Sequence, residues 1–217
     1  MVNRFTQSQL WINPERVMMT DQILLFSALS VAAYLLGSVP FGLIFTKISG
    51  RGDIRGIGSG NIGATNVLRT GSRKLAGLTL IFDAGKGAVA VAVAGHFAGS
   101  QMAAVAGLLV VAGHCFPIWL KFVGGKGVAT SLAVFATLDL RLGGLFVLVW
   151  LVTAWLSRFS SLAALCAVLA VTTGSFFLLD DGVTQIIILL LSALVWTRHH
   201  ANIGRLLNGT ETKIGVK

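Results

Sequence analysis

Seven apolar segments dominate this sequence, and each is long enough to cross, or nearly cross, the hydrocarbon core of a bilayer, which is about 30 Å thick. They fall at about 22–46, 75–98, 101–120, 127–138, 142–157, 161–179 and 183–197. Of the 217 residues, 55% are hydrophobic and only 12% are charged, and the mean hydropathy is +0.83. These values exclude an ordinary soluble domain. We predict an all-α integral membrane protein, a bundle of about seven transmembrane helices.

The fourth and fifth segments are short for full spans, and the polar turn Asp139-Leu140-Arg141 separates them. They form either two short spans or one re-entrant or bent element.

The distribution of basic residues predicts the orientation in the membrane. With the N-terminus outside, thirteen of the 17 Lys and Arg residues fall on one face. By the positive-inside rule that face is cytoplasmic, and the C-terminus lies on it. Membrane topology thereby accounts for most of the net charge of +9, so we do not expect nucleic acid as a partner.

We expect an N-terminal extension at residues 1–20 and a single transmembrane domain at 21–217. The first seventeen residues do not read as a signal peptide, and the physiological start is Met1, Met18 or Met19. The polar and glycine-rich parts of the domain all fall on the predicted cytoplasmic face. They are the loops 47–74, 121–130 and 157–161 and the tail 198–217.

The first of these loops contains a dense polar stretch at residues 58–70. Three glycines within six residues, Gly58, Gly60 and Gly63, let the backbone approach a ligand closely. Hydroxyl, amide and guanidinium donors accompany them, from Ser59, Asn61, Thr65, Asn66 and Arg69. The glycine spacing is that of a dinucleotide fingerprint, but residues 49–56 are too polar for the buried strand which that fingerprint requires. The stretch is typical of an anion-binding loop.

Two further constellations fit phosphate binding. Gly124-Gly125-Lys126-Gly127 stands at the start of a predicted helix, where free N–H groups favour an anion, but the spacing is not that of a Walker A loop. His199 and Asn202 are three residues apart and share a helix face just beyond the last span, followed by Arg205. Each constellation also has a purely structural interpretation. The first is then an ordinary glycine-rich turn at a cytoplasmic helix end, and the second a basic tail that binds lipid headgroups.

Asp83 and Lys86 lie inside the second span, three residues apart, and we predict a structural ion pair. Cys115 and Cys166 lack the spacing of a metal site or a disulfide framework, so no metal is expected. The loops hold no paired catalytic carboxylates and no Gly-x-Ser-x-Gly elbow. A site made of donors and cations suits two phosphates, or one phosphate and a developing oxyanion.

Five motifs resemble, in order and spacing, those of the bacterial acyl-phosphate:glycerol-3-phosphate acyltransferases. They are Ser59–Asn66 with Arg69, Asp83-x-x-Lys86-Gly87, Gly113–Pro117, Gly124–Thr130 and His199-x-x-Asn202-Ile203-x-Arg205. The Gly37–Gly42 end of the first span also fits, and the resemblance covers residue 20 to the C-terminus. The resemblance implies a multi-pass enzyme of the bacterial inner (cytoplasmic) membrane with seven spans and a cytoplasmic active site. It transfers a fatty acyl group from acyl phosphate to the 1-hydroxyl of sn-glycerol 3-phosphate, giving lysophosphatidic acid, and needs no cofactor.

The same resemblance assigns residues. Catalytic roles fall to Ser59, Arg69, Lys126, His199 and Asn202, and substrate binding to Gly60, Asn61, Thr65, Asn66, Gly125, Gly127, Ser161 and Arg205. The family often has a further serine where this chain has Ala164, so either Ser160 or Ser161 is the matching residue. The substrate's own phosphate serves as base in the implied mechanism. The expected partners are acyl phosphate, glycerol 3-phosphate, the lipid bilayer and an enzyme that produces acyl phosphate.

Two other functions are weighed against this one. A transporter of organic phosphates would place polar groups at the membrane midplane and would use two related halves, whereas polarity here lies on one face without an internal repeat. An alcohol phosphatidyltransferase would need an aspartate-rich metal motif, which is absent from the sequence.

Overall fold

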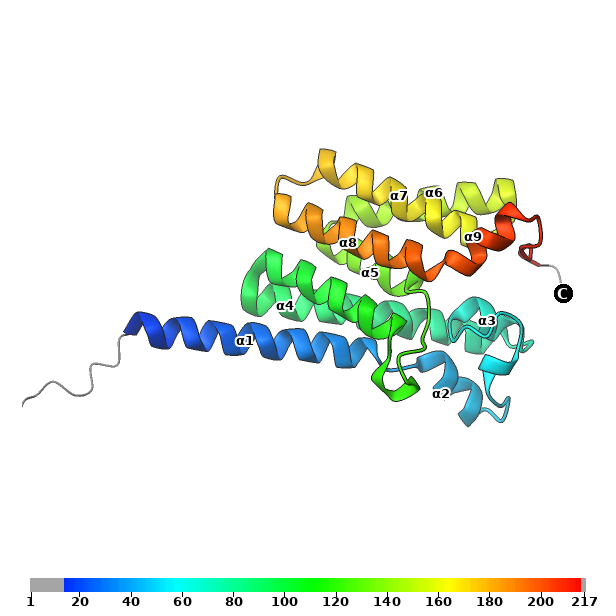
Figure 1. Ribbon diagram of the computed structural model, residues 1–217, viewed down its shortest axis with the longest axis horizontal. Coiled ribbons are helices and arrows are strands. Elements are labelled where there is room, and N and C mark those ends of the chain that lie inside the picture. Colours follow the sequence, from blue (N-terminus) through cyan, green and yellow to red (C-terminus); the bar gives the residue numbers. More distant parts are fainter. Residues whose placement is uncertain (1–13, 216–217) are drawn as a thin grey trace, which may run out of the picture.

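The computed structural model describes residues 14–215, with side chains described from residue 18, and every regular element in this range is helical. The long helices lie roughly along one axis of the molecule (Figure 1). They are α1 (Pro14–Gly37), α4 (Arg73–Cys115), α6 (Leu140–Ser157), α7 (Ser160–Leu178) and α8 (Gly182–Arg198). The shorter helices are α2 (Phe41–Ile48), α3 (Ala64–Leu68), α5 (Val128–Leu138) and α9 (His200–Leu207), with single 3₁₀ turns at Ile54–Gly56 and Ile118–Leu120.

The prediction of an all-helical bundle is confirmed for the described residues. Four helical stretches are long and apolar enough to span a membrane: Met18–Gly37, Arg73–Leu120, Leu140–Ser157 and Ser160–Leu178. A fifth span results if α8 and α9, which are bent by 58°, are counted together. α5, with 11 residues, is shorter than a full span. The seven crossings and their orientation therefore stay predictions.

Helix α4 folds back on itself at Gly99. This residue has φ +82° and ψ 178° inside an otherwise helical stretch, a conformation that favours glycine. Lys86 and His114 lie on opposite sides of the reversal, yet Lys86 Nζ is 2.8 Å from His114 Nδ1. A straight helix would separate residues 28 positions apart by about 42 Å. The two arms, 73–98 and 100–115, therefore lie side by side and match the predicted segments 75–98 and 101–120.

The predicted first segment, 22–46, is wrong as a single element. α1 ends at Gly37, and α2 begins at Phe41, after Pro40. Proline disfavours the helical conformation in the residue before it and donates no backbone hydrogen bond, so it breaks a helix even within an apolar run. Gly37 also packs directly on the backbone of Val110, where a Cβ atom would overlap the carbonyl, so α1 crosses α4 closely at this end.

The predicted N-terminal extension, residues 1–20, lies mostly outside the described residues. Its described part, residues 14–20, forms the first turns of α1. At the other polar turn, Asp139 caps α6 by accepting a hydrogen bond from Arg141 N at 2.8 Å. α5 and α6 are separate helices that pack together, with Gly143 against Ala136.

The helices pack into one connected bundle. α1 packs on α4, α4 also packs on α5 and α8, and α6 packs on α7. A continuous core of fully buried apolar side chains joins these helices and includes Val110, Val134, Phe135, Val168 and Ile188. Large apolar side chains such as Leu148, Trp155 and Phe177 are exposed on the outside, as expected of a surface that faces lipid.

Figure 1 shows α2, α3 and α9 together at the end of the bundle opposite the start of α1. The polar loops therefore meet there.

Candidate active site

Asn66 holds the first polar loop together from inside. It is 1% exposed, its Nδ2 donates to Ile54 O at 2.9 Å, and its Oδ1 accepts from Ser59 N at 3.2 Å. The Ser59 hydroxyl also reaches Asn66 Oδ1, at 3.4 Å. Predicted as a substrate-binding residue, Asn66 uses its amide within the loop and thereby places Ser59, which is exposed.

Glycines at two positions let this loop turn tightly. Gly58 and Gly60 have φ values of +55° and +67°. A Cβ atom on Gly58 would collide with the guanidinium of Arg69 and with Asn66 Oδ1. The Arg69 side chain therefore lies directly over the Gly58 backbone, with its charge at the loop surface. Asn61 Oδ1 is buried and has no hydrogen-bond partner among the described residues, whereas Thr65 is exposed.

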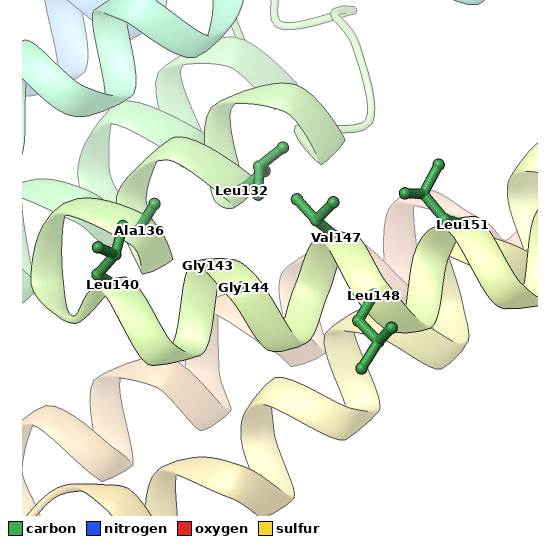
Figure 2. Close-up of a pocket in the computed structure, with 8 residues that line it drawn as sticks. All are labelled: Leu132, Ala136, Leu140, Gly143, Gly144, Val147, Leu148 and Leu151. Atoms are coloured by element: carbon green, nitrogen blue, oxygen red, sulfur yellow. The ribbon is translucent and has the colours of Figure 1, made fainter.

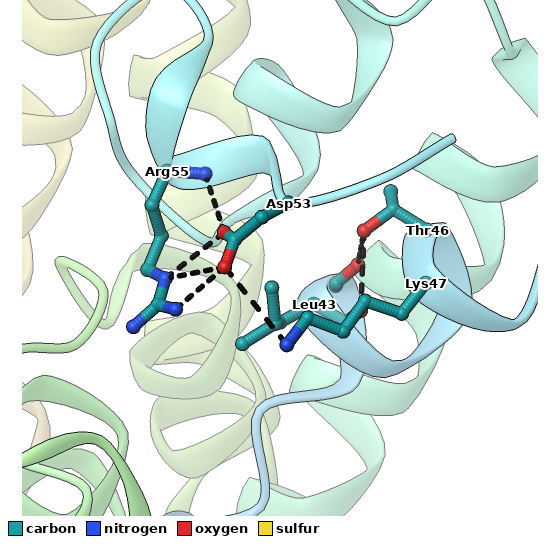
Figure 3. A network of polar contacts seen from close by, with 6 residues as sticks. Leu43, Thr46, Lys47, Asp53 and Arg55 are labelled. Carbon is teal, nitrogen blue, oxygen red and sulfur yellow. Dashed lines mark hydrogen bonds and ion pairs between the residues drawn. The ribbon is translucent and has the colours of Figure 1, made fainter. Parts of the chain in front are cut away.

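An ion-pair network ties α2 to the start of this loop (Figure 3). Asp53 accepts from Arg55 N at 3.0 Å and from Arg55 Nε at 2.9 Å, and Lys47 Nζ lies 3.9 Å from its carboxylate. The hydrogen bonds from Arg55 lower the pKa of Asp53 to about 2. On α2, Thr46 donates back to the Gly42 carbonyl at 2.9 Å. At the other end of the loop, Arg51 donates to the Thr70 carbonyl.

The glycine loop before α5 lies against the end of α4. Gly125 N donates to His114 O at 3.0 Å, and Gly124 N donates to Cys115 O at 3.1 Å. A Cβ atom on Gly125 would overlap the His114 ring, so this position requires glycine. Gly127 has φ +80° and begins the turn into α5. The loop thus presents the half-buried side chain between these glycines, that of Lys126.

Lys126 reaches the corner between α8 and α9. Its Nζ donates to Asn202 Oδ1 at 2.5 Å. His199, at the corner itself, is 2% exposed, and its Nδ1 lies 2.7 Å from Val195 O. A donating Nδ1–H leaves Nε2 as an acceptor in the neutral ring. The sharp bend of 58° between the two helices brings this corner to the glycine loop.

Glu211, in the C-terminal tail, is the hub of the cluster and escaped the sequence analysis. It accepts hydrogen bonds from Ser161 Oγ at 2.7 Å, Asn202 Nδ2 at 2.6 Å and Arg205 Nε at 2.6 Å. Burial acts to raise the pKa of Glu211, but these three hydrogen bonds outweigh it, so the pKa lies below its ordinary value. A signal was present, since Glu211 is the single acidic residue in the basic tail 198–217.

Several positive charges converge on Lys126. Burial is the main reason that the pKa of Lys126 falls to about 8, and the charges of Arg205, Arg69 and Arg198 lower it further, against the opposing effect of Glu211. Like charges gathered at one place repel, and an anion between them relieves the repulsion. Arg69 is thereby linked electrostatically to the Lys126 cluster, although it comes from the other polar loop.

Comparison with known proteins identifies the family. The sequence matches the profile of the glycerol-3-phosphate acyltransferases over residues 27–209. This chain belongs to that family. Its relatives include glycerol-3-phosphate acyltransferases of Mesorhizobium japonicum, 52% identical over 187 residues, and Roseobacter denitrificans, 49% identical over 187 residues. Each alignment covers 86% of this chain, and 95% and 93% of the respective relative.

Solved structures of the family share the fold. The glycerol 3-phosphate form of PlsY, an integral membrane glycerol 3-phosphate acyltransferase, is 35% identical, with a TM-score of 0.84 over 88% of this chain and 96% of that one. The lysophosphatidic acid form is 34% identical, with a TM-score of 0.82 over 88% and 95%. The family assignment and the prediction of a multi-pass integral membrane protein are therefore confirmed.

In this acyltransferase, the predicted site residues form two groups. Lys126, Asn202, Arg205 and Ser161 are joined by direct contacts through Asn202 and Glu211. Of the two candidate serines, Ser161 donates to Glu211, and Ser160 is the first residue of α7. Ser59, Gly60, Asn61, Thr65 and Asn66 lie together in the other loop.

The predicted ion pair of the acyltransferase is buried and includes a third residue. Lys86 Nζ lies 2.9 Å from Asp83 Oδ1 and donates to Val39 O at 3.2 Å, at the break between α1 and α2. His114 Nδ1 lies 2.8 Å from Lys86 Nζ and 3.5 Å from Asp83 Oδ1. The cluster therefore connects both arms of α4 to the end of α1, and the His114 ring continues it to Gly125.

An apolar groove lies between α5 and α6 (Figure 2). Its lining consists of Leu132, Ala136, Leu140, Gly143, Gly144, Val147, Leu148 and Leu151. Leu140, Leu148 and Leu151 are also exposed on the outer surface, so the groove continues into the lipid-facing side of the bundle. Its lining suits hydrocarbon chains and offers no polar side chain for the reaction.

Proposed function

We propose that this chain transfers a fatty acyl group from acyl phosphate to the 1-hydroxyl of sn-glycerol 3-phosphate. The 1-hydroxyl oxygen forms an ester bond with the acyl carbonyl carbon, and the bond between that carbon and the phosphate oxygen breaks. The hydroxyl proton leaves on the released phosphate. Membership of the family supports the acceptor and the product, because the solved relatives are described as glycerol 3-phosphate and lysophosphatidic acid forms. The acyl phosphate donor rests on the resemblance of the sequence motifs.

The observation that carries the proposed site is the carboxylate of Glu211. It accepts hydrogen bonds from three of the predicted site residues: Asn202, predicted as catalytic, and Ser161 and Arg205, predicted to bind substrate. Glu211 thereby holds these three side chains at one place, and a phosphate that binds beside them needs a cation. Lys126 supplies that cation from the glycine loop, and Arg69 and Arg205 add to it.

We assign glycerol 3-phosphate to this cluster and the donor to the neighbouring glycine-rich backbone. Lys126, Arg69 and Arg205 would bind the phosphate of the acceptor, while Ser161, His199 and Asn202 orient its hydroxyl groups. Acyl phosphate would bind over Ser59, Gly60, Asn61, Thr65 and Asn66 of the first loop and Gly125 and Gly127 of the second. N–H groups and hydroxyls there would stabilise the oxyanion that develops at the acyl carbonyl.

The proposed mechanism needs no protein base, since the phosphate of the substrate takes the proton. Catalysis then comes from holding the two substrates together and from stabilising the charge that develops in the transition state. His199, placed at the α8–α9 corner, would act as a neutral hydrogen-bonding group. An enzyme that produces acyl phosphate is a candidate partner, because the donor has to reach this membrane surface.

We further propose that the protein crosses the bacterial cytoplasmic membrane seven times, with its N-terminus outside and its C-terminus and active site in the cytoplasm. The gathering of α2, α3 and α9 at one end of the bundle supports a common side for the polar loops (Figure 1). Single cysteines at Ser49 and Asp180, both exposed, in a variant lacking Cys115 and Cys166, would test the orientation with a membrane-impermeant maleimide. Only the cysteine at 180 should react in intact cells. Labelling at position 49 and not at 180 would show that the protein has the opposite orientation in the membrane.

The activity is tested with purified protein, palmitoyl phosphate and glycerol 3-phosphate. Lysophosphatidic acid and phosphate should form in equal amounts, as measured by mass spectrometry and a phosphate assay. Omitting glycerol 3-phosphate separates transfer from hydrolysis, and palmitoyl-CoA tests the choice of donor. If only palmitoyl-CoA supported the reaction, the proposed donor would be wrong; if neither did, the proposed activity would be.

A further inference from the structure

The loop that carries Lys126 is fastened from two sides. On one side the end of α4 accepts its N–H groups, with Gly124 N bonded to Cys115 O at 3.1 Å and Gly125 N bonded to His114 O at 3.0 Å. The carbonyl groups of the same two glycines point the other way. The residue that receives them decides how firmly the loop is held.

That residue is Arg198, the last residue of α8. Its Nε donates to Gly125 O at 3.2 Å, and its Nη2 donates to Gly124 O at 3.1 Å. The guanidinium carbon lies 5.1 Å from the centre of the Phe116 ring, which adds a cation–π contact. One edge and the face of the guanidinium are thus used by the protein itself, and the side chain is half-buried.

We propose that Arg198 is a positioning residue that sets the distance between Lys126 and Asn202. Arg198 precedes Asn202 by four residues at the corner of α8 and α9. The same corner therefore donates to the carbonyl groups of the glycine loop, through Arg198, and accepts a hydrogen bond from the Lys126 ammonium, through Asn202. This inference rests on the proposed function insofar as Lys126 is taken to bind substrate. The clamp itself is independent of that assignment.

The geometry requires arginine. A guanidinium presents several N–H donors in a fixed planar fork and can serve two neighbouring carbonyls while stacking on a ring. A lysine carries the same charge on a flexible stem and cannot reproduce that arrangement. Arg198→Lys therefore removes the clamp and keeps the charge, whereas Arg198→Gln removes both.

The two variants are compared with Arg73→Lys, a matched control at an exposed residue in the first turn of α4. Two measurements are made on the full-length protein in detergent micelles: steady-state kinetics with palmitoyl phosphate and glycerol 3-phosphate, and hydrogen exchange of the amides of Gly124 and Gly125. We expect Arg198→Lys and Arg198→Gln alike to lower kcat/KM for glycerol 3-phosphate about 100-fold, as a misplaced binding group does. Exchange at both glycines should accelerate, and Arg73→Lys should change neither.

A double variant tests whether the effect passes through Lys126. Adding Arg198→Lys to Lys126→Ala should lower activity little further, because the two residues act as one unit. Three results would overturn the inference: an Arg198→Lys enzyme that behaves as wild type, fully additive losses, or lost activity with unchanged exchange, which would mean direct contact with substrate. If Lys126→Ala is fully active while exchange responds as expected, the proposed substrate site fails and the clamp stands.

Discussion

Lys126 and Asn202, 76 residues apart in the sequence, meet through a hydrogen bond from the lysine Nζ to the amide Oδ1. The other end of that amide donates to Glu211 at 2.6 Å, which fixes which way the amide points. Reversing the amide would turn an N–H group toward the ammonium and an oxygen toward the carboxylate. The orientation of the Lys126 ammonium therefore depends on the C-terminal tail as well as on the glycine loop.

Replacing Lys126 by alanine should impair use of glycerol 3-phosphate. The substitution removes the mobile cation from a site built to bind phosphate, so kcat/KM for this substrate should fall about 100-fold or more. Initial rates at varied glycerol 3-phosphate and saturating palmitoyl phosphate measure the effect. Lys74→Ala, at an exposed residue of α4, is the control and should be near wild type. Unchanged kinetics in Lys126→Ala would remove the residue from the site.

The pH profile should reveal the same ammonium group. With burial as the main cause, the pKa of Lys126 lies near 8, so the proton is lost as the pH rises through that value. We expect kcat/KM for glycerol 3-phosphate to fall on the alkaline side with an apparent pKa of about 8. Arginine keeps its charge throughout this range, so Lys126→Arg should move or abolish the alkaline limb. Blank reactions correct for spontaneous hydrolysis of acyl phosphate. An identical limb in both enzymes would assign it to another group.

Glu211→Gln should weaken both stability and activity. It exchanges a carboxylate that accepts three hydrogen bonds for a neutral amide whose NH₂ group faces donors, and bonds to charged groups contribute about 1.5–3 kcal/mol each. Since its pKa lies below the ordinary 4.5, ionised Glu211 stabilises the fold at neutral pH, and this contribution is lost as the pH falls through the lowered pKa. Thermal unfolding of the variant should show a lower Tm than that of the wild type at neutral pH. The Tm of the variant should also fall less than that of the wild type when the pH is lowered. Asp180→Asn, at an exposed residue, is the matched control.

Replacing one member of the buried pair Asp83–Lys86 should destabilise the fold more than replacing both. Lys86→Met leaves the Asp83 carboxylate buried without its main partner, which typically costs about 3–5 kcal/mol. Adding Asp83→Leu removes the orphaned charge, so the double variant should be more stable than the sum of the two single losses predicts. Unfolding in mixed detergent micelles, read by helical circular dichroism, provides the values. Strict additivity would mean that the two side chains stabilise the protein independently.

Hydropathy predicted the positions of most helices because lipid forces each spanning segment to be helical and apolar. The ends of α7 and α8 lie within one residue of the predicted segments 161–179 and 183–197. The same reasoning failed at Gly37–Pro40, where the apolar run continues through a break in the helix. Hydropathy measures transfer into lipid and is blind to backbone geometry, and Pro40 was the signal that should have overruled it.

The motifs singled out Lys126, Asn202 and Arg205, which the structure brings together, because glycine-rich backbone and cationic side chains are visible in a sequence. The roles of these residues in the reaction stay predictions. Glu211 was missed because an anion-binding site is expected to contain donors and cations, and an acidic residue in a basic tail does not fit that pattern. Arg198 was missed for a deeper reason. Its partners are the carbonyl groups of Gly124 and Gly125, and every residue has a carbonyl group, so no pattern of side chains reveals such a contact.

The reversal at Gly99 has a consequence for how the protein enters the membrane. The first arm of α4 carries Asp83 and Lys86, and their neighbour His114 belongs to the second arm. An arm that entered the bilayer alone would expose two ionisable side chains to lipid until the other arm arrived. We therefore expect the two arms to insert together as one helical hairpin. The turn at Gly99 then has to form before Asp83 and Lys86 enter the hydrocarbon of the bilayer.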